Sequence, residues 1–189
     1  EIEVLHIITS LGQGGAEHQL VELVKENKNH AVCQLVSGDF YEEELDGKKT
    51  IRFNLNLKKN IFDIIALFKL YRILIKYKPN IIHAWMYHSS LLAVLLKIFS
   101  FKWDISLVWG LRCSNMDTSK YSFFLKLVIK VCKYFSHVPD IIINNSHAGL
   151  EFHKSIGFKN KNIVIYNGID ISKFCSNNTL RINFRKKFK

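Results

Sequence analysis

Short apolar runs alternate along the chain with longer segments in which apolar residues recur every three or four positions. Runs of strand length lie at 2–9, 31–37, 51–57, 80–84, 105–109, 140–143 and 162–166. Most of these runs lack the apolar–polar alternation of half-exposed strands, as expected for strands that are covered on both faces. The alternation of strands and helices predicts a doubly wound α/β domain, with a mainly parallel, Rossmann-like sheet and helices on both faces.

Helices are expected between these strands, at 14–29, 61–78, 89–100, 121–135 and 146–155. The first carries Ala16, Leu20, Leu23 and Val24 on one face. The acidic stretch 39–46 is expected to be a loop.

The pattern changes after Gly168, where 172–179 is polar and 180–189 is basic with four spaced apolar residues. We therefore expect one domain over 1–170. Residues 171–189 are expected to be a linker and the start of a second domain that this chain does not contain.

Composition restricts the class of protein further. The chain has 189 residues, of which 48% are hydrophobic and 23% charged, as in a globular domain. Its four cysteines are scattered, which argues against a disulfide framework or a zinc site and fits a cytoplasmic location. No apolar run has the length of a membrane span. No signal peptide is expected, because the chain opens on residues that already read as a strand.

The positive charge is unevenly distributed. Residues 1–119 carry 14 Lys or Arg and 13 Asp or Glu, whereas residues 120–189 carry 13 and 3. Such asymmetry indicates an anionic partner surface, which could be membrane, nucleic acid or a phosphorylated substrate. A solvated basic face explains it equally well.

The first candidate site is the glycine-rich junction at 11–17 (LGQGGAE), between the first strand and the first helix. Ligands of open α/β sheets bind at the carboxyl ends of strands, and a helix N-terminus there offers N–H groups to an anion. Gly14 and Gly15 would let a phosphate or sugar approach the backbone. A dinucleotide fingerprint would need glycine where Glu17 stands. The alternative is a tight turn without a ligand.

The second candidate is the segment 79–89, where His83, Trp85 and His88 follow or end a strand. Aromatic rings with imidazole and hydroxyl groups suit sugar recognition. His83 could equally be a buried histidine that bonds the backbone. No metal site is expected, because no third ligand lies nearby.

The third candidate is Arg112, which follows the strand at 105–109. Its guanidinium could bind a phosphate or carboxylate, or form a structural salt bridge with Asp117. Cys113 has no evident base beside it, which disfavours a nucleophilic thiol.

The fourth candidate is the helix at 121–135, in which Lys126, Lys130 and Lys133 form a stripe beside Phe123 and Phe124. Basic residues beside aromatic ones suit the surface of an anionic bilayer. A sheet-covering helix with exposed lysines would have the same pattern.

Four of these segments, read together, resemble the family 4 retaining glycosyltransferases. They are 7–17 (IITSLGQGGAE), 79–83 (PNIIH), 140–146 (DIIINNS) and 165–170 (IYNGID), the last followed by Phe174. The resemblance covers almost the whole chain and implies the N-terminal half of a two-domain GT-B fold. Asn167, Gly168 and Asp170 would form the interdomain hinge.

The resemblance also implies the partners and site roles. The missing C-terminal domain would bind a nucleotide sugar, which is a substrate rather than a cofactor, and would carry the glutamates of an E-x7-E pattern. Gly14, Gly15 and Glu17 match the donor-phosphate and acceptor loop, and His83, Trp85, His88 and Arg112 match the acceptor-side rim. Many members place a histidine after the fifth strand, where this chain has Arg112, which leaves an electrostatic role for its guanidinium.

The acceptor implied is a glycan or a lipid-linked sugar of bacterial surface-polysaccharide assembly, at the inner face of the plasma membrane. This half-protein would be inactive without its partner domain. Two alternatives remain at this point: a nicotinamide-binding Rossmann domain, and a non-catalytic module that docks on membrane or nucleic acid through its basic region. No nucleic-acid motif is present, so nucleic acid is not an expected partner.

Overall fold

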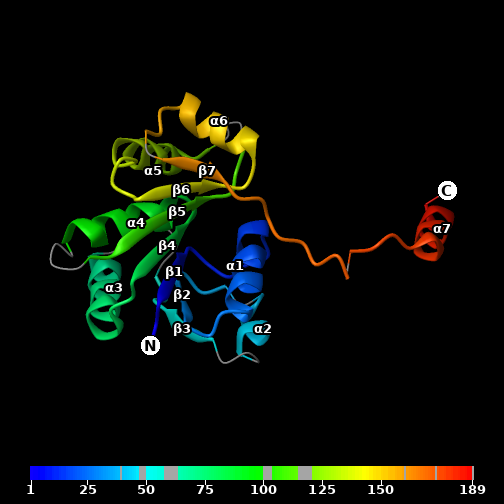
Figure 1. The fold of residues 1–189 in the computed structure, drawn as a ribbon, viewed down its shortest axis with the longest axis horizontal. Helices are drawn as coiled ribbons and strands as arrows, with labels where there is room; N and C mark the ends of the chain where they lie inside the picture. The colour runs from blue at the N-terminus through cyan, green and yellow to red at the C-terminus, as the bar shows by residue number, and fades with distance from the viewer. Residues whose placement is uncertain are drawn as a thin grey trace.

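The protein forms a single parallel sheet flanked by helices (Figure 1). The structure is a computed structural model that describes residues 1–38, 40–46, 50–57, 64–99, 104–114, 121–159, 161–172 and 174–188. The strands are β1 (Val4–Ile8), β2 (His30–Gln34), β3 (Ile51–Asn54), β4 (Ile81–Trp85), β5 (Ser106–Leu111), β6 (Ile141–Asn144) and β7 (Asn162–Val164). Their order is β3-β2-β1-β4-β5-β6-β7, and every neighbouring pair is parallel. The predicted fold class is confirmed.

The helices cover both faces of this sheet (Figure 1). They are α1 (Gly15–Lys25), α2 (Glu42–Asp46), α3 (Ile64–Tyr77), α4 (Met86–Phe99), α5 (Phe123–Tyr134), α6 (His147–Ser155) and α7 (Asn178–Lys187). The helices α3, α4 and α5 lie side by side on one face, and α1 and α2 cover the other. No helix in the described part of the chain is both long and apolar enough to cross a membrane.

Residues of β1, β2 and β4 enter two separate cores, because successive side chains point to opposite faces of a sheet. In β1, Leu5 and Ile7 pack into the core beneath α3, α4 and α5, whereas Ile8 packs into the smaller core with Leu20 of α1. All five residues of β1 are buried. This double burial explains the nearly continuous apolar runs of the sequence.

Several predicted boundaries are wrong. The first helix ends at Lys25 rather than at 29, and Leu23 is 37% exposed instead of belonging to the core. The acidic stretch that we expected to be a loop contains α2. Strand β4 continues to Trp85 and α4 begins at the next residue, Met86, which has a φ of 65°. A single residue in a left-handed conformation replaces the loop that the sequence predicts there.

Two residues of the segment 140–146, Asp140 and Ser146, fix the start of β6 and the start of α6. Asp140 accepts hydrogen bonds from Lys97 Nζ and from the Leu107 N–H, both at 2.7 Å, and so ties the start of β6 to α4 and β5. Burial would raise the pKa of Asp140, but these hydrogen bonds and the Lys97 charge hold it below its usual value. The Ser146 hydroxyl caps α6 by accepting from the Gly149 N–H at 3.0 Å.

The chain leaves the sheet after β7, and α7 lies apart from the domain (Figure 1). No residue of α7 is buried. The division at 170 between a domain and a linker with the start of a second domain stays a prediction.

Candidate functional site

A cleft opens beside α1, along the carboxyl half of the sheet, and has a volume of about 1040 Å³. Ligands of doubly wound sheets bind at this edge, next to the point where the strand order reverses between β1 and β4. The lining residues come from α1, from β4 to β6 and from the chain after β7. They are His18, Gln19, Glu22, Leu23, His83, Trp85, Arg112, Ile143, Ile165, Tyr166, Asn167, Gly168, Ile169, Asp170 and Phe174.

Arg112 lies at the centre of the residues that the sequence predicted. Its guanidinium carbon stands 4.6 Å from the centroid of the Trp85 ring, in a cation–π contact. The ring of His83 lies next to it, with its centroid 4.6 Å from that of Trp85. The structure therefore brings together His83, Trp85 and Arg112, as expected for residues that end neighbouring parallel strands.

No carboxylate among the described residues pairs with Arg112. Its Nη1 donates a hydrogen bond to Asn167 Oδ1, and its Nε is buried without a partner in the described part of the chain. Burial lowers the pKa of Arg112, but a guanidinium remains charged in proteins. Asp117, the alternative salt-bridge partner from the sequence analysis, lies outside the described residues. A partly desolvated cation at the wall of a cleft is suited to an anionic ligand.

Three histidines lie beneath this wall: His6 on β1, His30 on β2 and His83 on β4. His6 of β1 pairs with His83 of β4, and their ring centroids are 5.2 Å apart. Trp85 Nε1 donates to His6 Nδ1 at 3.1 Å, so His6 carries its proton on Nε2 and donates it to His30 Nδ1 at 2.9 Å. Burial, with the charges of His83 and His30, lowers the pKa of His6 well below its usual value.

His83 is kept neutral in the same way. Burial first, and then the charge of Arg112 and that of His30, lower the pKa of His83 to about 3. Its Nε2 is buried without a hydrogen-bond partner in the described residues. The ring fits because Gly110 of β5 has no side chain: a Cβ there would lie 2.9 Å from His83 Nε2.

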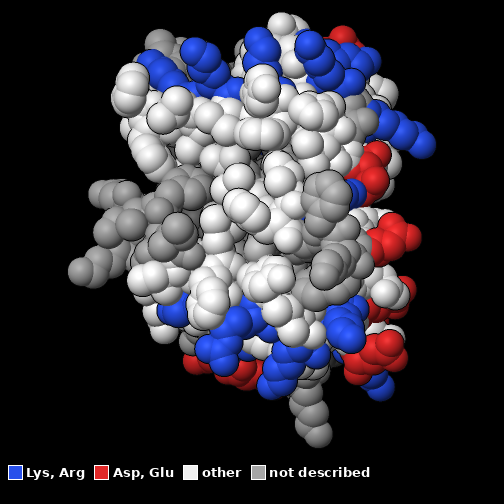
Figure 2. Space-filling model, turned by 90° about the vertical axis from the view of Figure 1, so that its left-hand side faces the viewer, with Lys and Arg blue, Asp and Glu red and all other residues white. Residues whose placement is uncertain are grey.

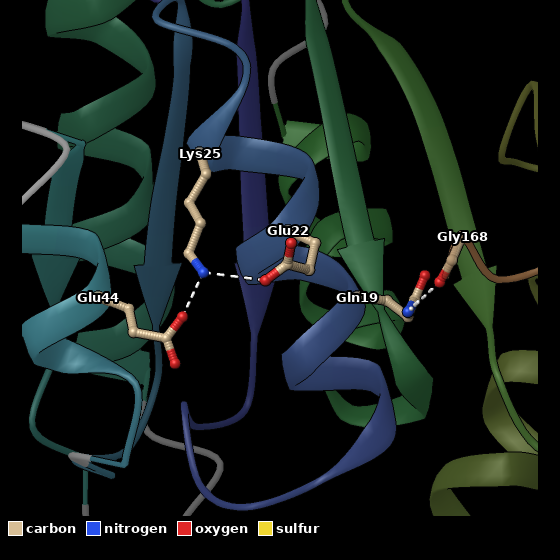
Figure 3. Close-up of polar contacts among 5 residues, drawn as sticks. All are labelled: Gln19, Glu22, Lys25, Glu44 and Gly168. Carbon is tan, nitrogen blue, oxygen red and sulfur yellow. Dashed lines mark hydrogen bonds and ion pairs between the residues drawn. The ribbon is translucent and has the colours of Figure 1, made fainter. Parts of the chain in front are cut away.

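The chain after β7 is fastened to the cleft at two points. Gln19 Nε2 of α1 donates to the Gly168 carbonyl at 2.9 Å (Figure 3), and Arg112 bonds Asn167 from the opposite wall. Asp170 shapes the next turn by accepting from the Ser172 N–H at 2.9 Å and from the Ser172 hydroxyl at 2.6 Å. The three predicted hinge residues therefore line the cleft, while their role as a hinge stays a prediction.

The helix α1 is also held on its other side. Lys25 Nζ donates to Glu22 Oε1 at 2.9 Å and pairs with Glu44 of α2 (Figure 3). Glu22 lines the cleft, so this ion pair joins the cleft wall to α2.

The glycine-rich junction lies at the same edge of the sheet but does not line this cleft. Gly14 is the N-cap of α1 with an extended φ of −159°, which any residue can adopt. A Cβ on Gly14 would lie 2.2 Å from a carboxylate oxygen of Glu17, so that side chain covers Gly14. A Cβ on Gly15 would meet nothing within 4 Å. The role of these three residues in binding donor phosphate stays a prediction.

The structure separates His88 from the cleft. Its ring stacks on Phe124 of α5, with centroids 6.2 Å apart, on the other face of the sheet. Lys126, Lys130 and Lys133 are exposed on α5, also on that face. His88 is therefore not brought together with His83 and Arg112.

Sequence reasoning missed the contribution of α1. His18, Gln19, Glu22 and Leu23 line the cleft, and the spacing of 18 to 22 and 19 to 23 puts them on one helix face. The available signal was the polar side of α1 that faces away from Leu20 and Val24.

Contrary to the expectation that no base lies beside it, the Cys113 Sγ is 4.0 Å from His153 Nε2. Burial raises the pKa of this thiol, which disfavours a thiolate nucleophile. Tyr87 bonds both the Cys113 Sγ at 3.2 Å and His153 Nε2 at 2.8 Å, which joins α4, the end of β5 and α6. In the described part of the chain, no group of three His, Cys, Asp or Glu residues could hold a metal ion.

Comparison with protein families gives a match to Glycosyltransferase Family 4 over residues 13–173. The chain belongs to this family. An uncharacterized glycosyltransferase of Methanocaldococcus jannaschii is 30% identical over 168 residues, which cover 79% of this chain and 41% of that protein. Membership of family 4 disfavours the alternative of a nicotinamide-binding domain.

Solved structures share the fold of this family 4 chain. The Anabaena protein Alr3699/HepE in complex with UDP and glucose has a TM-score of 0.77 at 17% identity, covering 100% of this chain and 50% of that one. A glycosyltransferase from Rickettsia africae has a TM-score of 0.63 at 15% identity, covering 99% and 49%. The family 4 chain thus spans about half the length of these proteins and has the fold of one half of a GT-B glycosyltransferase.

Proposed function

We propose that this chain is the acceptor-side half of an enzyme that transfers a sugar from a nucleotide sugar to a glycan or a lipid-linked acceptor. The transferred group would be a hexose or a related sugar, with retention at the anomeric carbon, in bacterial surface-polysaccharide assembly. Family membership supports the transferase activity. The chain covers only 41% and 50% of the length of two relatives, which supports a second, donor-binding domain after residue 170.

The observation that carries this proposal is the position of Arg112. Transfer breaks the bond between the anomeric carbon and a phosphate oxygen, so negative charge collects on the leaving nucleoside diphosphate. A preorganised cation at the cleft wall stabilises that charge. The Anabaena relative was solved in complex with UDP-glucose, which is consistent with a ligand of this kind.

The other lining groups suit the sugar side of the reaction. Tyr166 and Phe174 are 66% and 67% exposed along the cleft, and exposed rings can cover the apolar faces of sugars. His18 Nδ1 is buried without a hydrogen-bond partner among the described residues and can bond an acceptor hydroxyl.

Replacing Arg112 tests this function. Arg112→Lys keeps a positive charge but loses the planar fork that binds Asn167 and a phosphate. In a protein that joins this chain to the proposed donor-binding domain, we expect kcat/KM for sugar transfer from UDP-glucose to fall on the order of 100-fold. Arg52→Lys, at an exposed ion pair with Asp46, is the matched control. Equal activities of the two variants would contradict the proposal.

A further inference from the structure

Charge is segregated between the two faces of the sheet. The adjacent helices α3, α4 and α5 contain seven Lys or Arg residues and no Asp or Glu. On the opposite face, α1 has two glutamates and one lysine, and α2 has four acidic residues and no basic one. The excess positive charge of the folded domain therefore lies over three packed helices and not only on α5.

Large apolar side chains are exposed on the same three helices. Phe68 of α3 is 62% exposed, Phe99 of α4 67% and Phe123 of α5 84%. Smaller contributions come from Ile65, Ile75, Ile98, Phe124 and Leu127. Figure 2 views this side of the molecule and shows a broad uncharged surface between Lys and Arg residues at the top, where α5 and α6 lie, and at the bottom, where α3 lies.

We propose that this surface, the α3–α5 face, lies against an anionic lipid bilayer. Aromatic residues in the middle can enter the interface between headgroups and acyl chains, while the basic rim attracts anionic headgroups. This goes beyond the lysine stripe of α5, because it uses apolar residues from three helices.

The distribution of charge favours a bilayer over other partners. A surface for nucleic acid concentrates its positive charge where the phosphates lie, whereas here the basic residues border an apolar centre. A second copy of the chain would bring two basic rims together, and such like charges repel. Because the α3–α5 face and α1 lie on opposite sides of the sheet, docking leaves the cleft beside α1 open.

Two matched variants of the chain test the proposal. The face variant combines Lys126→Glu and Lys130→Glu with Phe99→Ser and Phe123→Ser. The tail variant changes the exposed helix α7 and the residue after it in the same way, with Lys186→Glu, Lys187→Glu, Phe184→Ser and Phe188→Ser. Both reverse two lysine charges and replace two exposed phenylalanines. Lys133 is left intact because its aliphatic carbons lie over Gly157.

The measurement is co-sedimentation with vesicles of phosphatidylcholine that contain about 30% phosphatidylglycerol, which mimics an anionic leaflet. We expect the wild type and the tail variant to bind, and the face variant to bind at least about 30-fold more weakly, as two lost lysine contributions imply. Binding should also weaken between 0.1 and 1 M salt, as the Debye length falls from about 10 Å to about 3 Å.

Three results would overturn the proposal: loss of binding in the tail variant only, equal binding to vesicles of phosphatidylcholine alone, or a lipid-free dimer that the face variant disrupts. Circular dichroism checks that the face variant is folded. If it is not, the double variant Lys126→Glu/Lys130→Glu changes only exposed charges and must still lose binding. Vesicle binding does not depend on sugar transfer, so the two proposals can fail separately.

Discussion

Acidification should destabilise the domain through its buried histidines. The pKa of His83 is about 3 in the fold, against an ordinary value of 6.5. Between these two values the unfolded chain binds more protons than the folded one, so stability falls as the pH drops below about 6.5. The groups that face His83 are His6, His30 and Arg112, and none of them is an acid that would favour the protonated ring.

The magnitude follows from linkage. Lowering the pH from 7 to 5 should cost about 2 kcal/mol through His83, since each unit below the unfolded pKa is worth about 1.4 kcal/mol. His6 acts in the same direction, because its pKa is also lowered by burial.

The assay is urea unfolding at pH 7 and pH 5, with His83→Gln and, as a control, His147→Gln on the exposed start of α6. The wild type and the control should lose about 2 kcal/mol more than His83→Gln over this range. An equal loss in all three proteins would refute the assignment of His83 as a neutral, desolvated histidine.

Two further predictions concern packing and thiol chemistry. Gly110→Ala should destabilise the domain by about 1–3 kcal/mol in urea unfolding, because its Cβ would lie 2.9 Å from His83 Nε2, which neighbouring rings hold in place. The control is Gly15→Ala, which has open space around it. Equal stabilities of the two variants would contradict the contact. A thiol reagent should modify Cys175 rapidly in the native protein and the other three cysteines only after unfolding, because these are buried and burial raises the pKa of Cys132 to about 12. Fast modification of more than one thiol would show that a buried cysteine is accessible.

The sequence predicts the sheet because its strands are buried on both faces and their apolar runs are nearly continuous. It fails at α2, where four acidic residues around Leu45 have too few apolar positions to show a period. The sequence also fails to predict the left-handed conformation of Met86, which replaces a loop between β4 and α4. The surrounding fold imposes this conformation on a non-glycine residue.

The candidate site could be predicted only in part. Arg112, Trp85 and His83 end or follow neighbouring strands, so the rule that ligands lie at carboxyl ends is enough to bring them together. The contact of His6 with His83 depends on the register of β1 against β4, and no local pattern records it. The packing of His88 on Phe124 likewise depends on where α5 crosses α4.

The central claim is that this chain forms one wall of a nucleotide-sugar cleft that a second domain completes. Calorimetric titration of UDP-glucose tests it most directly, with the 189-residue chain and with an extended protein that joins it to the proposed donor-binding domain. We expect a Kd of about 1 mM or weaker for the chain and of roughly micromolar order for the extended protein. Micromolar binding by the chain itself, or no binding by the extended protein, would contradict the account.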